Sequence, residues 1–64
     1  MLELDLLFLP FIEQRFVSLD APDREAYRRL LEEDDPTLMA WCAGRETPAD
    51  PSYVRIVAML RGRL

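Results

Sequence analysis

Acidic side chains are the most frequent candidates for chemistry in this sequence, and four of them follow one another directly. The run consists of Glu32, Glu33, Asp34 and Asp35. Paired carboxylates can exchange protons or hold a hard cation. A calcium loop, however, needs ligands at alternate positions and a glycine, and this contiguous run has neither. We therefore interpret the run as a helix cap and a solvated corner between two helices.

The single cysteine, Cys42, is the second candidate for chemistry. The chain contains no His, so neither a thiolate and imidazole pair nor a zinc site of Cys and His can form. Trp41 and Cys42 lie in one apolar stretch, and we predict that Trp41 is the central core residue and Cys42 a small buried side chain. With no nucleophile and base pair and no glycine-rich phosphate loop, we expect no catalytic residue, no metal site and no enzyme activity.

Length and composition restrict the class of protein further. The 64 residues carry a net charge of −4, and half of them are hydrophobic, which predicts a single small domain over residues 1–64. The longest basic cluster is the pair Arg28 and Arg29, so we expect no nucleic-acid partner. The apolar run at residues 6–12 is shorter than the ~20 residues that span a bilayer and has acidic rather than basic flanks. We expect no membrane insertion, and the use of Arg without Lys favours a bacterial cytoplasmic protein.

Proline and acidic residues divide the chain into four predicted helices. The first covers about residues 2–17, and the second follows Asp20, a plausible N-cap. The third begins with the cap Asp35 and stops near Gly44, and the fourth begins at Asp50 and carries its apolar stripe as far as Leu64. No stretch alternates as a strand would. The sequence therefore predicts an all-α fold, a small compact bundle of four helices.

The first predicted helix has more apolar surface than one core can cover. Its apolar side chains wrap nearly all the way round, and they are Leu2, Leu4, Leu6, Leu7, Phe8, Leu9, Phe11 and Ile12. Glu3 and Asp5 stand at its start, where carboxylates complement the helix dipole. Either a further helix or a partner protein must cover the remaining apolar face. From its residues alone, the chain is a small acidic helical interaction module.

Several short motifs, in this order and spacing, resemble a known family. They are Glu3-Leu4-Asp5, Pro10-Phe11, the D-D-P-x-L-x-x-W pattern from Asp34 to Trp41, Pro48-Ala49-Asp50, and a closing amphipathic helix. Together they resemble the succinate dehydrogenase assembly factors, also called flavinylation factors or flavinators. The resemblance extends along nearly the whole chain, and the D-D-P-x-L-x-x-W pattern is its most specific part.

The resemblance implies a helper protein rather than an enzyme. Members of the family are five-helix bundles that bind the flavoprotein subunit of succinate dehydrogenase, and often of fumarate reductase, and promote covalent attachment of FAD to a His of that subunit. FAD is thus carried by the client, and this chain is expected to hold no cofactor. In the family signature R-G-x-x-E, Met1, Leu2 and Glu3 match the last three places, so the Arg, the Gly and the first helix of the family would precede Met1. The implied partner-binding residues are Glu3, Asp5 and Phe11.

A second class of function fits the same composition. An acidic helical bundle with an exposed apolar face would equally serve as an interaction protein unrelated to flavin, such as an antitoxin-like regulator. The identity of the bound partner distinguishes the two classes of function, because a flavoprotein is expected only for an assembly factor.

Overall fold

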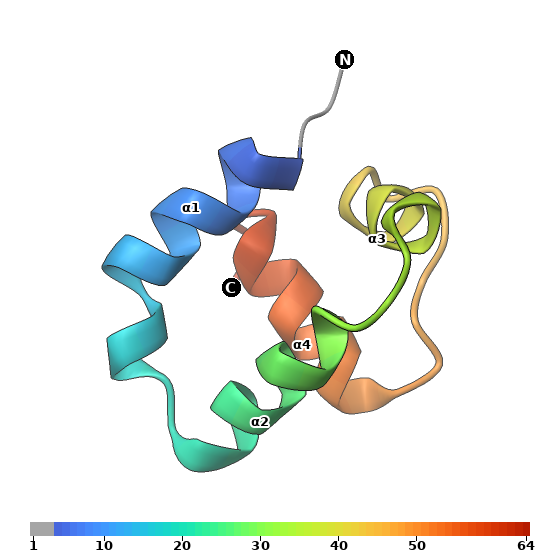
Figure 1. The fold of residues 1–64 in the computed structure, drawn as a ribbon. Helices are drawn as coiled ribbons and strands as arrows, with labels where there is room; N and C mark the ends of the chain where they lie inside the picture. Colours follow the sequence, from blue (N-terminus) through green and yellow to red (C-terminus); the bar gives the residue numbers. More distant parts are fainter. Residues whose placement is uncertain (1–3) are drawn as a thin grey trace.

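Four helices surround one core in the computed structural model, which describes residues 4–64 (Figure 1). They are α1 (Leu4–Gln14), α2 (Ala21–Leu30), α3 (Asp35–Cys42) and α4 (Pro51–Leu60), and a 3₁₀ turn, η1 (Phe16–Ser18), follows α1. Helix α4 runs through the middle of the molecule and contacts each of the other three helices. No strand occurs between residues 4 and 64, and the predicted all-α fold is confirmed.

Aspartate and proline start the last three helices. Asp20 precedes α2 and Asp50 precedes α4, as predicted, and the Oδ1 of Asp50 accepts a hydrogen bond of 2.8 Å from the backbone N–H of Ser52. The predicted cap of α3 was wrong by one residue, because Asp34 rather than Asp35 is the N-cap. Asp34 stands three residues before Thr37 and accepts from its backbone N–H at 3.3 Å, whereas Asp35 is already helical.

The two glycines of the chain end α3 and α4 in the same way. Gly44 and Gly62 have φ of 78° and 73°, the left-handed conformation in which glycine is favoured. After each glycine, the next backbone N–H bonds back to a helix carbonyl, from Arg45 to Ala40 at 2.9 Å and from Arg63 to Ala58 at 2.8 Å. The stop predicted near Gly44 is confirmed. The extension of the fourth helix to Leu64 is wrong, because Gly62 turns the chain and leaves Leu64 exposed.

The first helix is shorter than predicted. It ends at Gln14, and η1 then turns the chain, with the Ser18 hydroxyl donating a hydrogen bond of 2.8 Å to the carbonyl of Arg15. Pro10 lies inside α1, which continues through it. Residues 1–3, where the prediction began, lie outside the described part of the chain.

The core lies where α2 meets α4. Leu30 and Ile56 are fully buried there, and the ring of Tyr27 packs beside them. Three phenylalanine rings from α1 and η1 surround Tyr27, with centroid distances of 6.2 Å to Phe8, 5.0 Å to Phe11 and 5.5 Å to Phe16. These contacts hold α1 against the rest of the protein.

Trp41 is not the central core residue that the sequence predicted. It is only partly buried, and its ring lies 5.7 Å from that of Tyr53 at the edge of the core. The short α3 has a smaller contact with α4 than α2 has, so the α2–α4 contact supplies the centre instead. The prediction for Cys42 is confirmed, because its side chain is buried.

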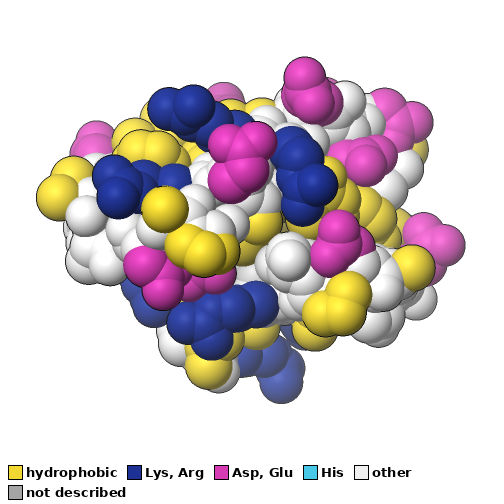
Figure 2. Space-filling model, turned by 90° about the horizontal axis from the view of Figure 1, so that it is seen from below, with side chains coloured by type: hydrophobic (Ala, Val, Ile, Leu, Met, Phe, Trp, Pro, Cys, Tyr) yellow, Lys and Arg dark blue, Asp and Glu magenta, His cyan; other side chains and the backbone are white. Residues whose placement is uncertain are grey.

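Two ion pairs also link α2 to α4. The Arg55 Nε lies 3.1 Å from both carboxylate oxygens of the buried Asp23. Arg29 approaches Asp50 at 3.7 Å, and its guanidinium lies 5.6 Å from the ring centre of Tyr53. Figure 2 shows arginine and acidic side chains alternating over the face seen from below, with apolar side chains between them. That face is therefore mixed in charge.

Candidate partner-binding surface

The outer face of α1 is the main apolar surface that the fold leaves open. The inner face packs Phe11, together with Leu4, Leu7 and Phe8, against the core. On the outer face, Leu6 is 67% exposed, Leu9 57% and Ile12 44%. Large apolar side chains grouped on one helix face are typical of protein interaction sites. The structure thus shows which part of the surplus apolar surface predicted for this helix remains uncovered.

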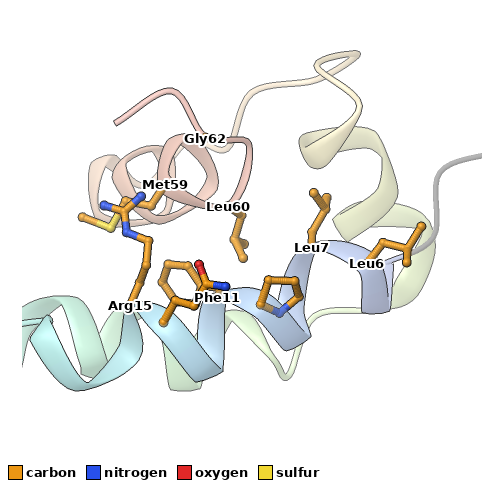
Figure 3. A pocket seen from close by; sticks show the side chains of 9 residues that line it. Leu6, Leu7, Phe11, Arg15, Met59, Leu60 and Gly62 are labelled. Atoms are coloured by element: carbon orange, nitrogen blue, oxygen red, sulfur yellow. The ribbon is translucent and has the colours of Figure 1, made fainter.

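A groove runs between α1 and the end of α4. Its volume is about 190 Å³. Figure 3 shows side chains of α1, among them Leu7 and Phe11, pointing toward Leu60 and Met59 on α4. The lining residues are Leu6, Leu7, Pro10, Phe11, Gln14, Arg15, Met59, Leu60 and Gly62. At one end of the groove, the Arg15 guanidinium donates a hydrogen bond of 2.8 Å to the backbone oxygen of Leu64. Leu6 forms part of both the groove and the exposed face, which makes the two surfaces continuous.

The structure places two of the three predicted partner-binding residues. Asp5 is exposed in the first turn of α1 and lines an open hollow of about 560 Å³ with Leu4, Asp35 and Met39. Phe11 is only 4% exposed and forms part of the groove wall, so its main contacts are with the core. Glu3 lies outside the described residues. A contact between these residues and a partner stays a prediction.

Sequence reasoning missed the residues that α4 contributes to this surface. Met59, Leu60 and Gly62 are close to α1 only because α4 passes beside it, and no local pattern carries that information. Leu6 and Leu9 were recognised as apolar but not as the exposed ones. A signal was present, because Leu4, Leu7 and Phe11 follow the three- and four-residue spacing of one helix face, which leaves Leu6 and Leu9 on the other.

The acidic run lies at the corner between α2 and α3. Asp34 caps α3, while Glu32 and Asp35 are exposed, in agreement with its interpretation as a cap and a solvated corner. Within residues 4–64, no group of three or more Cys, Asp or Glu side chains is placed to hold a metal ion.

Cys42 lies on the buried side of α3. Burial raises the pKa of its thiol above the ordinary value of 9.0, and the positive charge of Arg61 opposes this by a smaller amount. The thiol is therefore protonated at neutral pH, which agrees with a structural side chain rather than a nucleophile.

No helix in the described part of the chain combines the length and the hydropathy that a bilayer crossing requires.

Comparison with known proteins gives one consistent result. The sequence model of a family described as the flavinator of succinate dehydrogenase matches residues 1–64. The FAD assembly factor SdhE of Shewanella oneidensis is 46% identical over 63 residues, which cover 98% of this chain and 77% of the relative. The proteins of the same name from Pseudomonas aeruginosa and Idiomarina loihiensis are 39% and 36% identical over the whole chain, covering 76% and 71% of their own lengths. No solved structure matches significantly.

Proposed function

Because this chain belongs to the family of succinate dehydrogenase flavinators, we propose that it is an FAD assembly factor that binds the flavoprotein subunit of succinate dehydrogenase and promotes covalent FAD attachment there. The observation that carries the proposal is the match of all 64 residues to the family. The resemblance noted from the D-D-P-x-L-x-x-W pattern is thereby confirmed. The alternative of an antitoxin-like regulator gains no support from these comparisons.

The open surface of α1 supports a role in binding another protein. Its exposed leucines and the adjoining groove supply apolar area at one face of the molecule. Apolar side chains in the centre of an interface contribute most of the binding energy, and a polar rim excludes water from them. Asp5 stands in the first turn of the same helix, where it is suited to be part of such a rim, and Glu3 lies two residues before it in the sequence.

The proposed mechanism is positioning rather than catalysis by this chain. When bound to the client, FAD supplies its own reactive ring to the covalent linkage. By holding the client's domains in one arrangement, the factor would bring the flavin and the acceptor His together, and such positioning can lower a barrier by several kcal/mol. No residue of this chain needs to enter the reaction, so we propose a helper and not an enzyme.

The hollow beside Asp5 is unsuited to FAD itself. Two of its four lining residues, Asp5 and Asp35, carry carboxylates that would repel the diphosphate of the cofactor. This supports the proposal that the client, and not this chain, carries FAD. We further propose fumarate reductase as a second client and the bacterial cytoplasm as the location, the latter because the curated relatives named above are bacterial.

Flavin fluorescence of a denatured flavoprotein tests the proposed function, because only covalently bound FAD survives denaturation. The succinate dehydrogenase flavoprotein is produced in cells that lack their own assembly factor, together with the 64-residue chain or with the same chain carrying Arg-Gly before Met1. We expect a fluorescent band with at least one of the two. If neither gives a band while the Shewanella oneidensis relative does, the proposed function is wrong.

The same assay tests the predicted contact residues. Glu3→Ala and Asp5→Ala are compared with Glu25→Ala, which removes an equal charge from an exposed position on α2. We expect several-fold lower flavin yield for Glu3→Ala, a smaller loss for Asp5→Ala and no loss for Glu25→Ala, with helical content unchanged in all three. Equal yields from all three variants would contradict the assignment of these contacts.

A further inference from the structure

A separate hollow lies between the end of α3 and the second half of α4, away from the groove of α1. Its volume is about 160 Å³. Its lining includes the ring of Trp41, the aliphatic side chains of Val57 and Ala58, and two arginines, Arg61 and Arg63. The remaining lining residues are Gly44, Glu46, Thr47, Pro48 and Val54. An aromatic ring, aliphatic side chains and two cations therefore meet in one small pocket.

Gly44 makes room for the guanidinium of Arg61. A Cβ atom at Gly44 would lie 2.7 Å from the Nη2 of Arg61, closer than real Cβ contacts allow, and 3.1 Å from its Cζ, which is a tight contact. The guanidinium therefore lies against the backbone just beyond the end of α3. Arg61 is the C-cap of α4, so its side chain starts at the end of one helix and reaches the backbone beyond the end of another. The side chain is partly buried rather than extended into solvent.

In the described part of the chain, the guanidinium groups of this pocket form no hydrogen bond and no ion pair. Arg15, Arg29 and Arg55 each form a hydrogen bond or an ion pair, but within residues 4–64 neither Arg61 nor Arg63 donates one from its side chain. Glu46 lines the same pocket but forms no ion pair with either of them. A guanidinium presents five N–H donors in a planar fork that matches a carboxylate or a phosphate.

The charge of Arg61 also acts on the interior of the protein. It lowers the pKa of the Cys42 thiol, in opposition to the larger effect of burial. The field of a partly buried cation is screened less by solvent than that of an exposed one. An anion in the pocket would therefore be attracted by Arg61, and the carboxylate of Glu46 in the same lining would oppose part of that attraction.

We propose that the pocket between α3 and α4 binds a single oxyanion group, a carboxylate or a phosphate, held by the guanidinium of Arg61. Arg63 provides a second positive charge, and Trp41 forms the apolar wall. The small volume suits one such group and not a dinucleotide, because sites for drug-sized ligands occupy about 300–1,000 Å³. Oxyanion binding here does not depend on the assembly function, because this pocket and the groove of α1 share no lining residue.

Trp41 is the only tryptophan of the chain, so its fluorescence reports on this pocket directly. The purified protein is titrated with potassium phosphate, and separately with potassium acetate, against potassium chloride at constant ionic strength. We expect a saturable change in emission with at least one oxyanion, with a millimolar dissociation constant, and none with chloride. Saturation by phosphate alone or by acetate alone identifies the class of group that the site selects.

Two variants with the same net charge test the role of Arg61. Arg61→Gln is expected to weaken oxyanion binding at least about tenfold, because the paired charge-assisted hydrogen bonds are lost. Arg24→Gln removes a charge from an exposed position on α2 and is expected to bind as the unchanged protein does. The NMR signals of the Trp41 indole N–H and the Arg61 Nε–H provide a second readout. An absence of saturable change in both readouts, or an equal loss in the two variants, overturns the proposal.

Discussion

At the scale of single residues, Tyr27 combines close aromatic packing with a buried hydroxyl that lacks a partner in the described structure. Its ring is enclosed by three phenylalanines, but its hydroxyl is buried and has no hydrogen-bond partner in the described structure. A buried polar group without a partner costs free energy, because it has given up its hydrogen bonds to water. Burial also raises the pKa of the phenol above its ordinary value of 10.0.

We expect Tyr27→Phe to keep the fold and to raise the free energy of unfolding by up to about 1 kcal/mol, because it removes the unpaired hydroxyl and keeps the ring. Urea unfolding at neutral pH measures the change. Tyr53→Phe is the control, and we expect it to change stability by less than about 0.5 kcal/mol, because the Tyr53 hydroxyl is not among the buried groups without a partner. A loss of stability in Tyr27→Phe larger than in the control would show that the hydroxyl has a partner.

The raised pKa of Tyr27 also predicts how the stability of Tyr27→Phe differs from that of the unchanged protein at high pH. The raised pKa means that Tyr27 holds its proton to higher pH in the folded protein than in the unfolded chain. The stability that depends on this proton is fully present below pH 10.0, and it is lost as pH rises from there through the raised pKa. Tyr27→Phe is therefore expected to lose less stability above pH 10 than the unchanged protein does. Some alkaline loss remains in the variant, because the pKa of Cys42 is also raised.

Sequence reasoning at this scale succeeded where residue type alone decides the environment. Cys42 was predicted to be buried because its neighbours in the sequence are apolar and the chain has no His to activate it. The structure confirms that its side chain is buried. Trp41 was assigned to the centre on size alone, and this was wrong because the centre depends on which helices cross. For Phe11 the sequence did not separate the core side of α1 from the partner side, and the structure places most of its surface in the core.

At the scale of elements, the glycines after α3 and α4 form a matched pair. Both have positive φ, but a Cβ at Gly44 would meet Arg61, whereas a Cβ at Gly62 would meet nothing within 4 Å. We expect Gly44→Ala and Gly62→Ala each to lower the free energy of unfolding by about 1–2 kcal/mol, the cost of a left-handed conformation for a residue with a Cβ. Thermal unfolding of each variant measures this common loss of stability.

The two variants are expected to differ in the position of the Arg61 guanidinium. Gly44→Ala displaces this flexible group, so the NMR signal of the Arg61 Nε–H should shift, and oxyanion binding in the pocket should weaken. Gly62→Ala should change neither the Arg61 signal nor oxyanion binding, although it strains the backbone at residue 62. If the Arg61 signal keeps its position in Gly44→Ala, the guanidinium does not lie against Gly44 in solution.

The starts of α2 and α4 were the most predictable features of the fold. Aspartate followed by proline signals a helix start through chemistry local to a few residues, and it identified the starts of α2 and α4. The error at α3 arose because two aspartates stand side by side and only the hydrogen bond to Thr37 selects Asp34. For α4, the apolar position of Leu64 fitted the helix period, but Gly62 ended the helix first.

At the scale of the whole molecule, the division of α1 into two faces was the least predictable feature. The helical spacing separates two faces of α1, but both faces are apolar, so the spacing alone does not decide which one turns inward. The decision comes from long-range contacts, in which the phenylalanines of α1 and η1 pack around Tyr27 of α2. The candidate site has the same origin, because its groove exists only where α4 lies beside α1. Motifs predicted the family, and packing determined which apolar surface of α1 stays open.

That surface leads to a prediction about binding of the client flavoprotein. Leu9 on α1 and Leu31 after α2 are both exposed, at 57% and 47%, but only Leu9 lies on the α1 face. We expect Leu9→Ser to raise the dissociation constant for the flavoprotein subunit about tenfold, because a central apolar contact commonly contributes more than 1 kcal/mol. Leu31→Ser should change it less than about threefold. Calorimetric titration of the flavoprotein with each variant measures the difference, and a larger effect of Leu31→Ser would move the interface from α1 to the corner between α2 and α3.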